Sequence, residues 1–181
     1  MSWPTNEEWQ SKYERKARNP AIWRDHALAL REVAGLLWNH IEHAPAGEEK
    51  ARRIFAIGHT AMMLEGLAVE NLAKAVLVKK EPGVVAKGKW AGGRGHDLPK
   101  LFERIGLQFE LNDEKDLAVR LTAYVKWAGR YPVSLDFEEE IPTITEHAYG
   151  IPPGHYYSTG DREKVDALWK RLEVALKGDS K

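Results

Sequence analysis

The chain has 181 residues, 43% of them hydrophobic, and its 27 basic residues are matched by 27 acidic residues. This length and apolar content predict one domain with appendages. The balanced charge excludes a strongly basic nucleic-acid coat protein, so any nucleic-acid binding must come from a local patch. The absence of cysteine excludes disulfide bonds, thiolate zinc sites and a cysteine nucleophile.

A short helix is predicted near the N-terminus. Thr5 and Glu8 have the spacing of a capping box, in which each side chain accepts a hydrogen bond from the other residue's main-chain N–H. We therefore expect a helix over residues 6–17 that packs as an arm on the rest of the protein.

A second helix is predicted directly after this arm. Asn19 can cap a helix, and Pro20 suits the first helical position, so the pair predicts a helix over residues 20–43. A short turn at residues 46–48 favours an antiparallel return of the chain. The residues expected to face inward on this second helix are His26, Leu30, Val33, Leu37 and Ile41.

The longest apolar stretch, residues 54–80, predicts a buried central helix of roughly 40 Å. It contains no proline, and apolar or small residues recur at helical spacing, at Ile57, Ala61, Leu64, Ala68, Leu72 and Ala75. Glu65, Glu70 and Lys74 interrupt the run, which excludes a membrane span. The first residues also lack the pattern of a signal peptide. We therefore expect a cytoplasmic protein that does not contact membranes.

A glycine-rich loop over residues 79–96 is expected after the central helix. It contains the one local basic patch of the chain, formed by Lys87, Lys89 and Arg94. Asp97 is expected to cap a short helix that ends at Gly106. Asn112 is expected to cap the next helix, which runs to Gly129.

Prolines within residues 129–160 exclude a long helix there and predict a long irregular loop. Asp161 is expected to cap a last amphipathic helix that stops at Gly178. Clean strand alternation is absent. The sequence therefore predicts an all-α protein, with an N-terminal helical arm over residues 1–18 and a helical bundle over residues 19–178.

Glu70, Asn71 and Lys74 are the first candidates for a polar site, because they interrupt the apolar face of the central helix. Glu70 and Lys74 are four residues apart, with the carboxylate first, which is the favourable order for a helical ion pair. One interpretation is a simple ion pair at the margin of the core. The other is a partly desolvated pair that orients His96 or Arg130.

Other polar residues lie where predicted helices begin or end. His96 precedes a helix start, where it could act as a base or a ligand, or simply fix the loop. Arg130 follows a helix end, where it could bind a phosphate or a carboxylate, or stabilise the helix dipole. His40 and His43 are close enough to share a metal ion, but no third ligand is suggested, so we predict no metal site.

Three segments occur in order along the chain, GLAVENLAKA, GHDLPKLF and YVKWAGRYP, ahead of a final helix opened by Asp161. In this order and spacing, the chain resembles the HEPN superfamily, the higher eukaryote and prokaryote nucleotide-binding domains, over residues 54–176. The resemblance implies an antiparallel four-helix core and dimers formed through the bundle. Many members of that family cleave RNA or act in toxin–antitoxin and antiviral systems, so the resemblance also implies roles of this kind.

The ribonuclease members of that family carry an arginine, then four to six residues, then a histidine, on a late helix. Arg130 has no histidine within that window, whereas Arg52 and Arg53 both satisfy the spacing with His59. Those residues open the central helix instead of lying on a late one, so we do not transfer catalysis to them. The chain is similar to the branch that lacks the nuclease pair.

Our leading hypothesis is a non-catalytic, HEPN-like homodimer that binds the phosphate of a nucleotide or of RNA and requires no cofactor. It would be an accessory subunit of a toxin–antitoxin, defence or stress system, with a cognate protein partner encoded nearby. The predicted ligand-binding residues are Lys87, Lys89, Arg94, His96, Arg130 and Tyr131. The residues predicted to support them from beneath are Glu70, Asn71 and Lys74.

Two alternatives stay open at this point. The first is a metal-independent endoribonuclease, a toxin in which His96 or His59 is the acid–base group and an arginine such as Arg52 contacts the scissile phosphate. The second is a structural protein whose arm docks a partner through Trp3 and Trp9. RNA cleavage in EDTA and deletion of the arm separate these alternatives.

Overall fold

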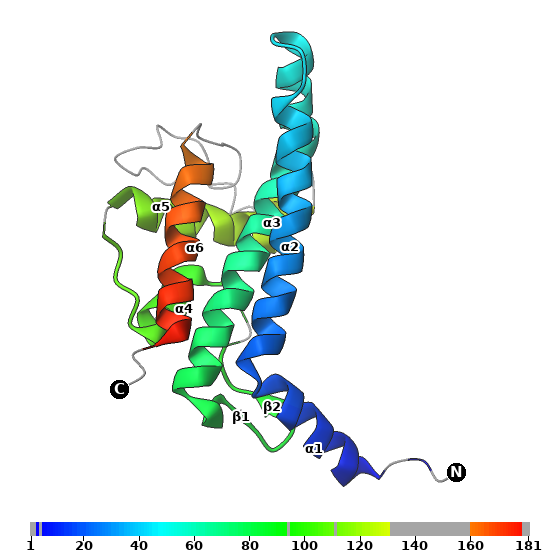
Figure 1. Ribbon diagram of the computed structural model, residues 1–181, viewed down its shortest axis with the longest axis vertical. Helices are drawn as coiled ribbons and strands as arrows, with labels where there is room; N and C mark the ends of the chain where they lie inside the picture. The colour runs from blue at the N-terminus through cyan, green and yellow to red at the C-terminus, as the bar shows by residue number, and fades with distance from the viewer. Residues whose placement is uncertain (1–2, 4, 94, 111, 131–159, 179–181) are drawn as a thin grey trace.

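The computed structural model describes residues 3, 5–93, 95–110, 112–130 and 160–178 (Figure 1). The α-helices of this part are α1 (Asn6–Ala17), α2 (Pro20–Glu42), α3 (Glu48–Lys80), α4 (Leu98–Ile105), α5 (Asn112–Ala123) and α6 (Asp161–Lys177). The shorter elements are the 3₁₀ turn η1 (Pro82–Val84), the strands β1 (Val85–Ala86) and β2 (Lys89–Trp90), and the π-helical segment η2 (Tyr124–Ala128). The expected all-α class is confirmed at this level. Among these residues, none of the helices combines the length and the hydropathy that a membrane crossing requires.

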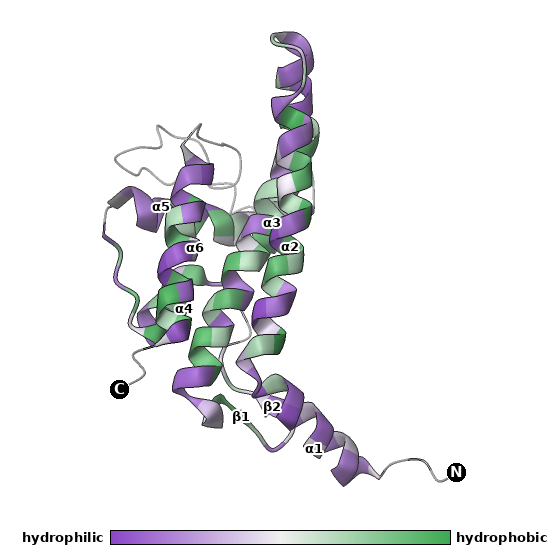
Figure 2. Ribbon diagram, viewed as in Figure 1, coloured by the Kyte–Doolittle hydropathy of each residue, from purple (hydrophilic) through white to green (hydrophobic). Residues whose placement is uncertain are grey.

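The two N-terminal helices begin at the caps that the sequence predicts. Glu8 Oε2 accepts a hydrogen bond from the Thr5 N–H at 2.6 Å, and Thr5 Oγ1 accepts one from the Glu8 N–H at 3.3 Å, which completes the capping box. Asn19 Oδ1 accepts a hydrogen bond from the Ala21 N–H at 3.0 Å. α1 is largely hydrophilic and buries none of its residues, so it is an arm and not part of the core (Figure 2).

α3 is the central element of the bundle. It packs against α2 on one side and against α4, η2 and α6 on the other (Figure 1). It begins at Glu48, earlier than the predicted start at Ile54, because acidic residues in its first turn suit the positive end of the helix dipole. At about 50 Å it is long enough to project, together with α2, beyond the rest of the bundle.

The inward face of α2 differs from the predicted one. Val33 is 47% exposed and His26 is also exposed, so these two predictions are wrong. The buried residues are Ala27, Ala34, Trp38 and Ile41. The physical reason is that α2 turns small alanines toward α3, which lets the two helices approach closely and leaves the larger Val33 outside.

α5 and η2 pack closely against α3 at Gly66. A Cβ at this position would lie 2.7 Å from Val125 Cγ2 and 3.0 Å from the main-chain oxygen of Leu121, so a side chain would push the elements apart. The helix predicted to run as far as Gly129 changes to π-helix at Tyr124. This close approach places the end of η2 beside the middle of α3.

α6 begins at Asp161, but this residue does not cap the helix as predicted. Gly160 occupies the cap position, and no side chain accepts a hydrogen bond there. Asp161 is instead fully buried and accepts two hydrogen bonds from the Arg120 guanidinium, one of them 2.9 Å long. The prediction is wrong because this ion pair between α5 and α6 takes the carboxylate away from its own helix end.

The glycine-rich loop contains a small antiparallel hairpin, β1–β2, that the sequence does not predict. Lys87 and Gly88 form its turn, and both have positive φ, which matches the twist of a two-residue hairpin. The Gly88 N–H donates to Glu14 Oε1 at 2.8 Å, and Arg18 Nε donates to the Val85 main-chain oxygen at 2.8 Å. α1 therefore holds the hairpin in place.

Candidate functional site

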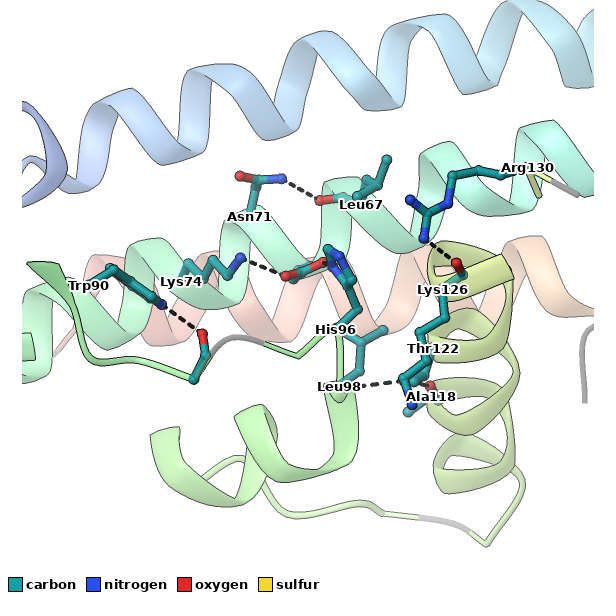
Figure 3. A network of polar contacts seen from close by, with 12 residues as sticks. Leu67, Asn71, Lys74, Trp90, His96, Leu98, Ala118, Thr122, Lys126 and Arg130 are labelled. Carbon is teal, nitrogen blue, oxygen red and sulfur yellow. Dashed lines mark hydrogen bonds and ion pairs between the residues drawn. The ribbon is translucent and has the colours of Figure 1, made fainter. Parts of the chain in front are cut away.

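The candidate site is centred on Glu70, a buried carboxylate on α3. Its Oε1 lies 2.6 Å from Lys74 Nζ, one turn further along the same helix. Its Oε2 lies 2.8 Å from His96 Nδ1, in the residue before the cap of α4 (Figure 3). These two partners offset the desolvation of the buried charge. The contact with His96 favours an orienting role for Glu70 over a simple ion pair.

Lys74 lies close to two tryptophan rings. Its Nζ is 5.6 Å from the Trp23 ring centroid and 5.9 Å from the Trp90 centroid, within the range of cation–π attraction. Trp90 Nε1 donates to the Gly93 main-chain oxygen at 3.0 Å, and a Cβ on Gly92 would lie 2.2 Å from the Trp90 ring. Trp90 therefore ties the glycine-rich loop to α3, in a contact that only glycine at position 92 permits.

A cavity of about 440 Å³ lies beside this network. Its loop wall is formed by Gly92, Gly93 and Gly95, and Asp97 and Leu101 also line it. Its cationic side chains come from α3, α4 and η2 and are Lys74, Lys100, Arg104 and Lys126. We call it the basic cavity. Cationic donors beside exposed glycine main chain are the groups that bind anions.

Carboxylates balance most of the charge of the basic cavity. Lys100 Nζ lies 2.9 Å from Asp97 Oδ2, and Arg104 donates to Glu81 Oε2 at 2.8 Å. Burial acts to raise the pKa of Asp97, but hydrogen bonds from Lys100 and the charges of Lys100 and Lys126 outweigh it and lower that pKa. The hydrogen bond from Arg104 lowers the pKa of Glu81. Among the described residues, Lys74, Lys100 and Arg104 each lie beside a carboxylate, namely Glu70, Asp97 and Glu81.

The fold divides the basic patch predicted in the glycine-rich loop. Lys87 and Lys89 are exposed on the hairpin, and neither lines the basic cavity. Arg94 and Tyr131 lie outside the described residues. His96 is the predicted ligand-binding residue that the structure places in contact with Glu70.

Arg130 and Asn71 lie at the edges of the network. Arg130 is exposed after η2, and its guanidinium donates to the main-chain oxygen of Lys126 (Figure 3). Lys126, and not Arg130, lines the basic cavity. Asn71 Nδ2 donates to the Leu67 main-chain oxygen at 2.7 Å, and its side chain points toward α2, away from His96. Asn71 lines a separate apolar cavity formed by α1, α2 and α3.

The two residues considered for nuclease activity on α3 lie apart from Glu70, by about 27 Å for Arg52 and about 16 Å for His59 along the helix axis. Arg52 is exposed and lies 3.9 Å from carboxylate oxygens of Glu48 and Glu49. The His59 ring packs 5.5 Å from the Tyr124 ring. Arg52 and His59 are therefore not part of the basic cavity.

Sequence reasoning missed three residues of the basic cavity, Lys100, Arg104 and Lys126. Lys100 and Arg104 offered a signal, since they are four residues apart on the polar face of a short helix that follows a glycine-rich loop. Lys126 offered none, because its position depends on how η2 packs against α3. Within the described residues, no group of three His, Cys, Asp or Glu side chains is arranged to hold a metal ion.

No protein-family model, curated protein or solved structure matches this chain. The resemblance to the HEPN superfamily therefore stays a proposal. The Glu70–Lys74–His96 network and the basic cavity are the basis on which a function is assigned.

Proposed function

We propose that this chain is an HEPN-like helical domain that binds the phosphate of a nucleotide or of RNA, without catalysis, as an accessory subunit of a toxin–antitoxin, defence or stress system. A homodimer and a cognate protein partner belong to the same proposal. The observation that carries it is the basic cavity, where side chains from three elements direct four cationic groups toward one glycine-walled hollow.

The lining of the basic cavity suits phosphate for two reasons. Lysine and arginine form charge-assisted hydrogen bonds to phosphate oxygens, and glycine leaves the main-chain N–H groups of the loop accessible. Lys100 is exposed, so its ion pair with Asp97 is weak and can exchange for a ligand. Lys74 is held by Glu70 and lies near two tryptophan rings. A phosphate would therefore contact one ammonium group that is already held in place, that of Lys74, and other cationic side chains that can change rotamer to bind it.

Binding of a labelled single-stranded RNA and of a labelled nucleotide to the full chain tests this proposal. Lys126→Ala is expected to weaken binding about five- to tenfold at low salt, because it removes one of the four cationic groups that line the basic cavity. Lys170→Ala, at an exposed position of α6, is the matched control and should leave the affinity unchanged. Lys89→Ala shows separately whether the hairpin contributes.

Salt dependence sharpens this experiment. The slope of log affinity against log salt concentration should fall by about one in Lys126→Ala and stay constant in Lys170→Ala. Equal losses in the two variants would contradict a site at the basic cavity. Affinity that does not depend on salt would contradict phosphate binding altogether.

A second candidate function, a metal-independent endoribonuclease, is favoured by the contact between Glu70 and His96. A carboxylate that accepts a hydrogen bond from Nδ1 fixes the imidazole, so that Nε2 can exchange a proton with a substrate. RNA incubated in EDTA should then be cleaved by the wild type and by His59→Ala, but not by His96→Ala. No cleavage by the wild type, or equal cleavage by both variants, removes this candidate.

A further inference from the structure

α2 carries a row of exposed residues on the side that faces away from α3. Three large apolar residues belong to it, with Ile22 45%, Val33 47% and Leu36 63% exposed. The row, which we call the α2 stripe, consists of Ile22, His26, Ala29, Val33, Leu36 and His40. Its members are separated alternately by four and three residues, which is the pattern of a coiled-coil seam. The opposite face of α2 already packs on α3, so the α2 stripe is a second seam of this helix, and its side chains are exposed.

Acidic residues flank the α2 stripe. Asp25 and Glu32 are exposed and directly precede His26 and Val33, and Asn39 occupies the next equivalent position. Residues at such positions face the flanking residues of a partner helix and select opposite charges. An antiparallel second copy would set Glu32 against its own counterpart, and like charges repel. The α2 stripe therefore favours a partner with lysine or arginine at its flanks.

An apolar cavity of about 270 Å³ lies at the N-terminal end of the α2 stripe. The residues that line it include Tyr13, Lys16 and Ala17 of α1 and Ile22, Trp23 and His26 of α2. Helices that dock in a groove commonly place one large apolar side chain in such a hollow as an anchor. The α2 stripe and this cavity share Ile22 and His26, so they form one continuous surface.

We propose that the α2 stripe is the docking surface for an amphipathic helix of a different protein. That helix carries basic residues beside its apolar seam and an aliphatic or aromatic anchor that enters the cavity. The heptad spacing favours a helix over an extended strand, and the acidic flank disfavours an anionic membrane surface. Residues 22–40 span about 27 Å, which corresponds to about five turns of partner helix.

Two synthetic helical peptides test the proposal. They share one heptad seam of leucines with a single tryptophan anchor and differ only in their flanking residues, lysine in one and glutamate in the other. We expect the full chain to bind the lysine peptide at least about tenfold more tightly in fluorescence anisotropy. Asp25→Lys combined with Glu32→Lys should reverse this preference.

Substitutions on α2 locate the binding surface. Val33→Ser combined with Leu36→Ser should weaken binding of the lysine peptide at least about tenfold. Leu28→Ser, an exposed leucine of the same helix outside the α2 stripe, is the matched control and should leave binding unchanged. Circular dichroism checks that each variant keeps its helices.

Four results would overturn the proposal. Three of them are equal affinity for the two peptides, no binding of either at about 100 µM, and equal losses in the Leu28 and the Val33/Leu36 variants. The fourth is a dimer of the chain alone, detected by sedimentation, that the Val33/Leu36 variant dissociates, because it would assign the α2 stripe to a second copy. Lys126→Ala should leave peptide binding unchanged, so this test is independent of phosphate binding.

Discussion

Glu65 and Glu70 are two buried carboxyl groups of the same helix, α3, but they differ in their hydrogen-bond and ion-pair partners. Glu70 has Lys74 at 2.6 Å and His96 at 2.8 Å. Glu65 is 6% exposed, and within the described residues its Oε2 accepts no hydrogen bond, with Arg31 Nε at 4.0 Å. A buried carboxylate is tolerated where hydrogen-bond donors contact its oxygens, whereas a buried carboxyl group with too few donors favours its protonated form.

The surroundings of Glu65 explain its behaviour. Arg31 of α2 also pairs with Asp166 of α6 and lies 4.5 Å from the Trp169 ring centroid, so its charge is shared. Burial raises the pKa of Glu65 to about 7, with Arg31 and Arg162 opposing the rise and Asp166 adding to it. The junction of α2, α3 and α6 therefore contains a carboxyl group that titrates near neutral pH.

A third buried carboxylate, Asp161, has a bidentate partner, because the Arg120 guanidinium donates to both of its oxygens. Arg120→Met should lower the free energy of unfolding by about 3–5 kcal/mol, since Asp161 would keep a buried charge after losing this partner. Urea unfolding followed by circular dichroism measures the loss. Adding Asp161→Asn should restore part of it, and a loss below about 1 kcal/mol in Arg120→Met would contradict the expectation.

Glu65→Gln is expected to change the pH dependence of stability. Because the pKa of Glu65 is raised from 4.5 to about 7 in the folded protein, the folded state holds this proton more tightly. Its contribution to stability is present below the unfolded value and is lost as the pH rises through about 7. Relative to the wild type, the variant should gain about 3 kcal/mol between about pH 4 and about pH 8.

Urea unfolding at several pH values measures this difference for Glu65. Glu163→Gln, which removes an exposed acid from α6, is the matched control and should follow the wild type at each pH. Parallel stability curves for the wild type and Glu65→Gln would show that Glu65 titrates alike in the folded and unfolded chains.

Glu70→Gln should have the opposite sign to Glu65→Gln at about pH 8, although both remove one charge from α3. We expect a loss of about 1–2 kcal/mol in the free energy of unfolding, because two charge-assisted contacts, to Lys74 and His96, are weakened. The same urea experiment measures it. If both variants were stabilised, the contrast between the two carboxylates would be wrong.

Gly92→Ala is expected to have the smallest effect on stability, below about 1 kcal/mol, because the change lies in a surface loop. A Cβ there would lie 2.2 Å from the Trp90 ring, so the loop wall of the basic cavity must move. Hydrogen exchange of loop amides should therefore become faster. Gly95→Ala, where a Cβ would meet no atom within 4 Å, is the control and should exchange like the wild type.

Local signals predicted most helix ends, because a cap acts within one turn of its own helix. Asn19 and Asp97 cap α2 and α4 as expected, and Gly106 ends α4 with a positive φ. Asp161 stands at a similar position before a predicted helix but does not cap it, since its carboxylate binds Arg120 from another helix. A cap prediction is thus reliable only where no distant ion competes for the side chain.

The inward row of α2 failed for a related reason. Its heptad and helical periodicities allow more than one apolar face, and periodicity does not state which of them meets α3. The choice of the Ala27 and Ala34 face was made by how closely α3 can approach. Val33 was therefore left in the α2 stripe, on the outside.

The sequence by itself determined that the chain is helical, where most of its helices begin and end, and that Glu70 and Lys74 share one face of the central helix. Only the tertiary structure decided that Lys126 joins the cationic residues of α4 around the basic cavity. It also decided that Glu65 is buried where no described residue donates a hydrogen bond to its Oε2. The physical reason is how far apart along the chain the interacting groups lie. Helix caps depend on residues within four positions, whereas desolvation and ion pairing depend on groups that other elements bring into contact.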